Sequence, residues 1–202
     1  MTIHNCTQNS PTPIPGPVAP LAQTTSSAAA ELWTPPFYVD KVRAVLGQID
    51  LDPFSCAGAN LTVQANRYFC AGSAPFKRDW RAKTIFMSPP SSEKLLLRAA
   101  RRFLKELRRG RFEQAIVLVN EAPDCLWYNL LASRADAICV TRKPIPFNTP
   151  NGGSQTSGAG MQAFLLFGPD RKFFRQLFTG VGAISLAKKA PIRPAKVRRR
   201  RP

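Results

Sequence analysis

Thr84-Ile85-Phe86-Met87-Ser88-Pro89-Pro90-Ser91-Ser92 is an apolar run that stops abruptly at two prolines. Residues 85–87 predict a buried strand, and the prolines end it because they lack the backbone N–H that a sheet requires. A stiff turn with exposed carbonyls then follows the strand, at the place where open α/β sheets bind their ligands. This stretch predicts an α/β fold with a ligand site in its turn.

Strand and helix patterns alternate on both sides of this stretch. Strands are expected at residues 48–51, 85–87, 115–119, 137–140 and 162–167, and helices at 34–47, 93–109, around Trp127 and Leu131, and at 170–178. Such alternation predicts a three-layer sandwich with a mostly parallel sheet. The Gly- and Ser-rich loop at 144–160 is interpreted either as a target-recognition element or as a plain insertion.

The composition divides the chain into three parts. Residues 1–30 contain five prolines and no Asp, Glu, Lys or Arg, which predicts a disordered tail. Residues 31–182 carry the periodic patterns and predict one folded domain. Residues 183–202 are basic and spaced by prolines, which predicts a second disordered tail.

The charge balance points to a polyanionic partner. Lys and Arg number 29 against 12 Asp and Glu, a net charge of +17, which makes nucleic acid the leading candidate. No run approaches 18 apolar residues, so we expect a cytoplasmic protein without a membrane span. Eight Lys or Arg fall between residues 94 and 111, where Glu106 is the only acid; these bases form either a phosphate-binding stripe or a solvated helix face. The candidate DNA contacts are Arg98, Arg101, Arg102, Lys105, Arg198, Arg199, Arg200 and Arg201.

The cysteines do not suggest a metal site. There are five of them with no close pair, and the single histidine lies at position 4. Zinc sites need clustered Cys and His ligands, so we expect no metal and reduced thiols that simply pack.

Polar or proline-bearing turns follow three of the expected strands. They are Asp50-Leu51-Asp52-Pro53, Ser88-Pro89-Pro90 and Asn120-Glu121. If the strands are parallel, the three turns meet at one carboxyl edge of the sheet, where a crevice binds ligand. Taken singly, each is also an ordinary turn former.

Five blocks in this order resemble the phage-type DNA N6-adenine methyltransferases. The blocks are Glu31-Leu32-Trp33-Thr34-Pro35, Ile49-Asp50-Leu51-Asp52-Pro53-Phe54-Ser55-Cys56-Ala57, Phe86-Met87-Ser88-Pro89-Pro90-Ser91-Ser92, Ala115-Ile116-Val117-Leu118-Val119-Asn120 and Gln162-Ala163-Phe164-Leu165-Leu166-Phe167-Gly168. The resemblance implies a Rossmann-like fold that transfers a methyl group from S-adenosylmethionine to the exocyclic N6 of adenine in double-stranded DNA. It also implies a monomer acting in the cytoplasm of a bacterial or phage-infected cell.

The resemblance assigns the catalytic turn to Ser88, Pro89, Pro90 and Ser91. An aromatic amine is a poor nucleophile, and acceptors around its N–H bonds localise the lone pair for attack on a methyl group. Ser88 stands at the acceptor position, Pro89 supplies a carbonyl, and Ser91 replaces the ring that stacks on the flipped base in the family. We expect Phe86, Trp33 or Phe147 as substitutes for that ring.

The resemblance also assigns a cofactor site. Its residues are Glu31, Trp33, Thr34, Pro35, Asp50, Asp52, Pro53 and Ser55, with Asp52 as the leading contact. Three alternatives stay open: a member that has lost turnover and only binds DNA, a cytosine-N4 methyltransferase, and an enzyme acting on RNA.

Overall fold

A seven-stranded mixed sheet crosses the part of the chain that the computed structural model describes, residues 31–158 and 160–187. Its order is β2-β1-β3-β4-β8-β5-β9. The strands are β1 (Leu51–Asp52), β2 (Arg67–Tyr68), β3 (Thr84–Met87), β4 (Gln114–Asn120), β5 (Ala137–Thr141), β8 (Gln162–Phe167) and β9 (Gly182–Leu186). The tail predicted at 1–30 and the bases from Arg198 to Arg201 lie outside the described residues.

The expectation of a mostly parallel sheet is wrong. Strand β1 pairs in parallel with β2 and β3, and β3 pairs in parallel with β4. Strand β8 is antiparallel to both β4 and β5, and β9 is antiparallel to β5. Half of the neighbouring pairs are therefore antiparallel, because β8 inserts between two strands that precede it in the chain.

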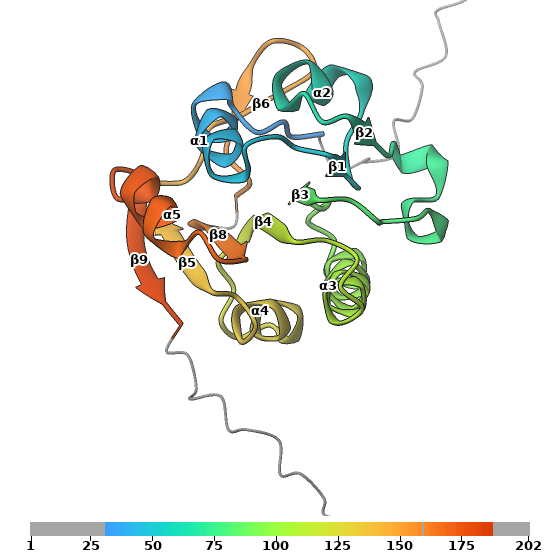
Figure 1. Cartoon of the computed structure of the whole chain (residues 1–202). Helices are drawn as coiled ribbons and strands as arrows, with labels where there is room; N and C mark the ends of the chain where they lie inside the picture. The colour runs from blue at the N-terminus through green and yellow to red at the C-terminus, as the bar shows by residue number, and fades with distance from the viewer. Residues whose placement is uncertain (1–30, 159, 188–202) are drawn as a thin grey trace, which may run out of the picture. The chain divides into compact units, whose positions relative to one another are not determined.

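Helices cover both faces of the sheet (Figure 1). They are α1 (Pro36–Leu46), α2 (Ala57–Val63), α3 (Glu93–Arg108), α4 (Leu126–Ala132) and α5 (Arg171–Phe178), with short 3₁₀ turns η1 (Ala71–Ser73) and η2 (Pro75–Lys77). Residues of α1, α2 and α5 share one hydrophobic core with one face of the strands. Residues of α3 and α4 share a second core with the other face. Three layers result, as expected for an α/β sandwich.

Helix α1 begins later than the sequence suggested. The sequence predicted a helix from residue 34, but the helix starts at Pro36, and Pro35 is an extended N-cap without a side-chain hydrogen bond. A residue before proline avoids the helical region, and the backbone of Trp33 is held extended by its pairing with Asn148. The helix ends at Gly47, whose φ of 74° favours glycine.

Several elements were not foreseen from the sequence. Helix α2 and strand β2 lie between the two predicted turns, and β9 continues the sheet past the boundary expected at 182. The loop at 144–160 contains a small hairpin, β6 (Phe147–Asn148) with β7 (Ser154–Gln155). No helix in the described residues is long and apolar enough to span a membrane.

Candidate active site

The carboxyl ends of β1 and β3 form a topological switch point. From β1 the chain passes through α2 to β2 on one side, while β3 lies on the other side of β1. The register pairs Leu51 with Ile85, so the Asp52 turn and the Ser88 turn leave the sheet side by side. Open α/β sheets bind ligands at such a point because the diverging connections leave a crevice. The structure therefore brings the two predicted turns together at one edge.

Asp52 is the most perturbed acid of this edge. Its side chain is 2% exposed, and its Oδ1 accepts a hydrogen bond from the Phe54 N–H at 3.0 Å. Burial raises the pKa of Asp52 to about 8, although the hydrogen bonds from Phe54 and the Ser55 side chain oppose the rise. A carboxyl group that is neutral near pH 7 can donate a hydrogen bond as well as accept one. Pro53 is buried and Ser55 half-buried in the same turn.

Glu31 and Trp33 lie over the same turn, against the start of α2. A Cβ at Gly58 would meet the Trp33 Cζ2 at 2.6 Å, so the indole ring rests on the glycine backbone. Burial raises the pKa of the Cys56 thiol, and a hydrogen bond to Glu31 raises it further, which places that carboxylate beside Cys56. The Trp33 Nε1 is buried without a hydrogen-bond partner in the described residues. An unpaired buried donor at this position points to a ligand group as its partner.

Thr34 and Pro35 connect this segment to α1. Thr34 is 5% exposed and Pro35 is half-buried. The backbone of Trp33 exchanges two hydrogen bonds with Asn148, at 2.8 and 2.9 Å, so the β6–β7 hairpin holds the segment in place. Four of the eight predicted cofactor residues thus come from a segment that precedes the sheet in the chain.

Ser88 and Pro89 are half-buried at the end of β3, and Pro90 and Ser91 are exposed. Strand β3 is buried along its whole length, which fixes the position at which the turn leaves the sheet. No backbone N–H in the described residues donates to the Pro89 carbonyl. That oxygen is free to accept a hydrogen bond from a ligand.

Side-chain hydrogen bonds form a polar network at the neighbouring carboxyl end of β4. The Asn120 Oδ1 accepts hydrogen bonds from the Ser157 hydroxyl at 2.9 Å and from the Gln162 Nε2 at 3.1 Å. Gln162 is 1% exposed, and its Oε1 accepts a hydrogen bond from the Ile145 N–H at 2.6 Å. Gln162 thereby ties both ends of the 142–161 loop to the edge. The sequence offered one signal for it, a glutamine that opens an apolar strand.

Asp50 lies away from the other predicted cofactor residues. Its Oδ2 accepts hydrogen bonds from the backbone N–H groups of Lys83 and Thr84 at 3.0 and 3.1 Å. Its Oδ1 accepts a third from Asn66 at 3.1 Å. These bonds hold the amino end of β3, opposite the carboxyl edge. They give Asp50 a structural role away from the predicted cofactor site.

The bases of α3 have two different environments. Arg101 and Lys105 are exposed, and the Arg98 guanidinium lies 4.0 Å from the centre of the Phe76 ring. Arg102 turns inward: it donates to the Phe76 and Arg78 carbonyls at 3.4 and 3.1 Å and lies 3.2 Å from Glu106. Glu106 is 2% exposed, and Arg109 and Arg111 lie 3.8 and 4.0 Å from it. Arg102 therefore joins α3 to the segment that contains Phe76 and Arg78, and it is not a free surface base.

Three rings were expected to replace the aromatic side chain that position 91 lacks, and each of them packs against other residues. Phe86 is fully buried and Phe147 is 6% exposed, both within the core beneath α1. The Trp33 ring packs on Gly58. Phe86 and Phe147 are therefore not free to stack on a base, whereas Trp33 is half-buried with part of its ring against Gly58.

No family model matches the chain, and no curated protein matches it in sequence.

Proposed function

We propose that the protein is an S-adenosylmethionine-dependent DNA methyltransferase that modifies the N6 amine of adenine. The observation that carries the proposal is the meeting of the Asp52 turn and the Ser88-Pro89 turn at the switch point between β1 and β3. A cofactor and a base need adjacent sites for methyl transfer, and this edge offers one turn for each. A net charge of +17 supports DNA as the substrate.

The residues around the Asp52 turn fit the cofactor. The buried Trp33 Nε1 lacks a partner, Asp52 carries a buried carboxyl group, and the Glu31 carboxylate is exposed beside Cys56. Such a set suits a ligand that carries both hydroxyl groups and an ammonium group. Glu31, Trp33, Asp52 and Ser55 would hold the cofactor, which supplies an electrophilic methyl group.

The residues of the second turn act on the amine. The Pro89 carbonyl and the Ser88 hydroxyl accept hydrogen bonds from its two N–H groups, which localises the nitrogen lone pair. Ser88 is neutral and short, so it is a weaker acceptor than a carboxylate. The acceptors stand on a turn fixed by the buried strand β3, and such placement lowers the cost of reaching the reacting geometry.

A second candidate is a protein that binds DNA without turnover. The exposed Ser91 and the commitment of Phe86, Phe147 and Trp33 to packing favour it, because a flipped base then lacks its stacking partner. Base stacking on an aromatic ring is worth roughly 1–3 kcal/mol.

The test uses the purified chain, duplex DNA and methyl-labelled S-adenosylmethionine, followed by digestion and identification of the labelled nucleoside. We expect N6-methyladenine from the wild type. Ser88→Ala with Pro89→Ala should lose at least about 100-fold in rate, because it removes the Ser88 hydroxyl and the proline ring that stiffens the turn, although the backbone carbonyl of residue 89 remains. Exposed Ser133→Ala with Pro169→Ala is the matched control and should keep the wild-type rate. Labelled N4-methylcytosine would instead show that cytosine is the substrate base.

Two outcomes would contradict the proposal. If the Ser88 and Pro89 double variant transferred methyl groups at the wild-type rate, these residues would not form the catalytic site. Salt-sensitive DNA binding by the wild type with no label in any nucleoside would favour the candidate without turnover.

A further inference from the structure

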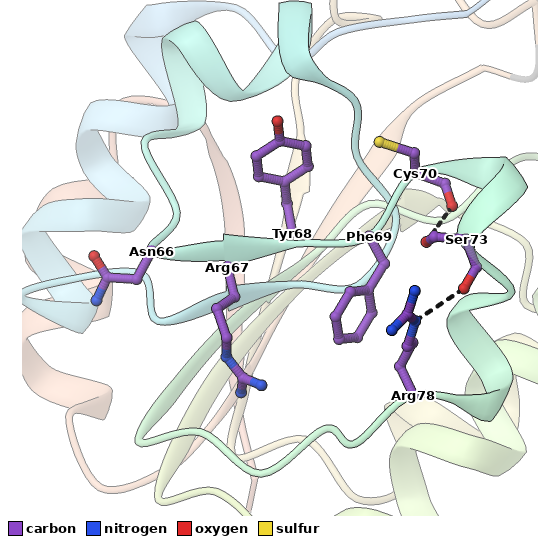
Figure 2. A pocket seen from close by; sticks show the side chains of 7 residues that line it. All are labelled: Asn66, Arg67, Tyr68, Phe69, Cys70, Ser73 and Arg78. Carbon is purple, nitrogen blue, oxygen red and sulfur yellow. Dashed lines mark hydrogen bonds between the residues drawn. The ribbon is translucent and has the colours of Figure 1, made fainter.

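A cavity of about 390 Å³ opens beside edge strand β2. It is lined by residues 66–70 together with Ser73 and Arg78. Figure 2 shows the Arg67 and Phe69 side chains on one side of β2, with Arg78 approaching the Phe69 ring from the facing turn and Tyr68 on the other side. Two guanidinium groups therefore flank an aromatic surface.

No carboxylate in the described residues forms an ion pair with Arg67 or Arg78, although Asp50 accepts a hydrogen bond from the lining residue Asn66 at 3.1 Å. The Arg78 Nε donates to the Ser73 carbonyl at 3.1 Å, and the Arg67 guanidinium donates to the Arg81 carbonyl. Both anchors are neutral carbonyls, and none of the lining residues is an acid. The nearest acid in sequence, Asp79, is exposed and its Oδ1 accepts a hydrogen bond from the Arg81 N–H at 3.1 Å. Guanidinium groups held in this way are preorganised for an anion with several oxygens.

The walls of the cavity are fixed by the rest of the fold. The Phe69 N–H donates to the Asp52 carbonyl at 3.1 Å, and the Ser55 N–H donates to the Phe69 carbonyl at 3.0 Å. On the other wall, Arg102 of α3 binds the Phe76 and Arg78 carbonyls. The cavity is thus joined directly to the Asp52 turn of the candidate active site.

Further bases extend the cavity into a larger surface. Lys77, Arg81 and Lys83 are exposed in the segment that follows it. Arg98 stacks on the Phe76 ring and brings the basic face of α3 up to the same segment. We call these residues, with Arg67 and Arg78, the β2-edge basic surface. Its continuity favours an extended polyanion over an isolated small ion.

We propose that this cavity binds the phosphodiester backbone of the DNA strand, with one phosphate between Arg67 and Arg78 and the adjoining sugar or base on Phe69. The cavity volume lies in the range of ligand sites, and a positive groove with an aromatic surface is how proteins hold a nucleic-acid strand. The assignment rests on the proposed DNA substrate but not on methyl transfer. Its contact to phosphate positions the strand without reading sequence.

The experiment measures binding of the full chain to a labelled DNA duplex over a series of salt concentrations. We expect Arg67→Ala with Arg78→Ala to weaken binding about tenfold and to reduce the slope of log K against log salt by roughly 1. Arg134→Ala with Arg175→Ala removes the same charge from exposed positions on α5 and after α4, and should change the slope much less. Arg67→Lys with Arg78→Lys keeps the charge and should retain most of the slope.

Thermal melting of each variant checks that it folds. The Lys double variant separates loss of charge from loss of folding, because it keeps long basic side chains at both positions. A slope in the Ala double variant equal to that of the control overturns the proposal. Dependence of anionic-vesicle binding on Arg67 and Arg78, with duplex binding unchanged, also overturns it. A reduced slope supports it even if the wild type transfers no methyl group, and methyl transfer with an unchanged slope leaves only the active-site proposal standing.

Discussion

The two halves of the sheet differ in how their strands are held. In the parallel half, β1 and β2 are two residues long, and β1 meets β3 at a single paired position, Leu51 with Ile85. In the antiparallel half, β8 pairs with β4 over six residues and with β5 over four. The candidate active site and the β2-edge basic surface both belong to the half with the shorter pairing.

This difference shows that side chains supplement short backbone pairing in the half that carries the two candidate sites. Asp50 binds the amino end of β3, and Arg102 holds the segment facing β2. The Phe54 ring, which follows the Asp52 turn, lies 5.4 Å from the Phe76 ring and 5.8 Å from the Trp80 ring. Short strands leave room for turns at the edge, and these contacts supply the rigidity that a long ladder gives elsewhere.

A large loss of stability is expected in the antiparallel half. Gly182→Ala would place a Cβ 2.6 Å from the Val140 carbonyl carbon and 2.9 Å from the Thr141 Cα. Because both neighbours are backbone atoms of β5, the pairing of β9 must shift, and we expect a loss of about 3 kcal/mol or more in unfolding free energy. Urea denaturation measures it. Gly180→Ala is the control, since a Cβ there meets nothing within 4 Å. Equal stability of the two variants would show that β9 contributes little to the rigid half.

Asp52 gives the second effect, in the parallel half. Its pKa is about 8 in the folded protein and about 3.9 in an unfolded chain, so the folded state binds more protons between these values. Wild-type stability should therefore fall as pH rises from about 4 to 8, by up to about 1.4 kcal/mol per pH unit, and this contribution should level off outside that window. Asp52→Asn should lack this component, so its advantage over the wild type grows with pH.

Urea denaturation of both proteins across this pH range tests the prediction. Asp124→Asn, at an exposed position, is the comparison for loss of one carboxylate. A difference between wild type and Asp52→Asn that stays constant with pH would show that Asp52 does not destabilise the edge.

The smallest effect comes from restoring a ring at the edge. Ser91→Tyr should leave folding stability within about 0.5 kcal/mol, because the position is exposed. It should tighten DNA binding by about 1 kcal/mol, roughly fivefold, if a base stacks there. Binding titration of the labelled duplex measures the change, with Ser133→Tyr at the exposed end of α4 as the control. Equal DNA affinities of the two variants would show that no base stacks at position 91.

The long elements could be predicted because their patterns are complete within a short window. Helix α3 runs from 93 to 108, as its apolar spacing indicated to within one residue. Strand β4 is one residue longer than predicted at each end, and β8 coincides with its predicted run. Strand β1 was expected at 48–51 and lies at 51–52. A two-residue strand carries almost no periodic signal, so its position depends on its neighbours.

The candidate site was predictable in part for the same reason. The expectation that the Asp52, Ser88 and Asn120 turns share one edge is confirmed by the parallel pairing of β1, β3 and β4. The inward role of Arg102 was not predictable, because its partners Phe76 and Arg78 lie more than twenty residues away. The β2-edge cavity likewise joins segments whose approach no local pattern encodes.

Local chemistry in the sequence set the α/β class, the polar turns after three strands and the strong positive charge, since each depends on residues close together in the chain. Long-range packing set the direction of β8, the burial that raises the pKa of Asp52 and the placement of Arg67, Phe69 and Arg78 around one cavity. Burial and electrostatic environment belong to the assembled fold, because segments remote in sequence create them.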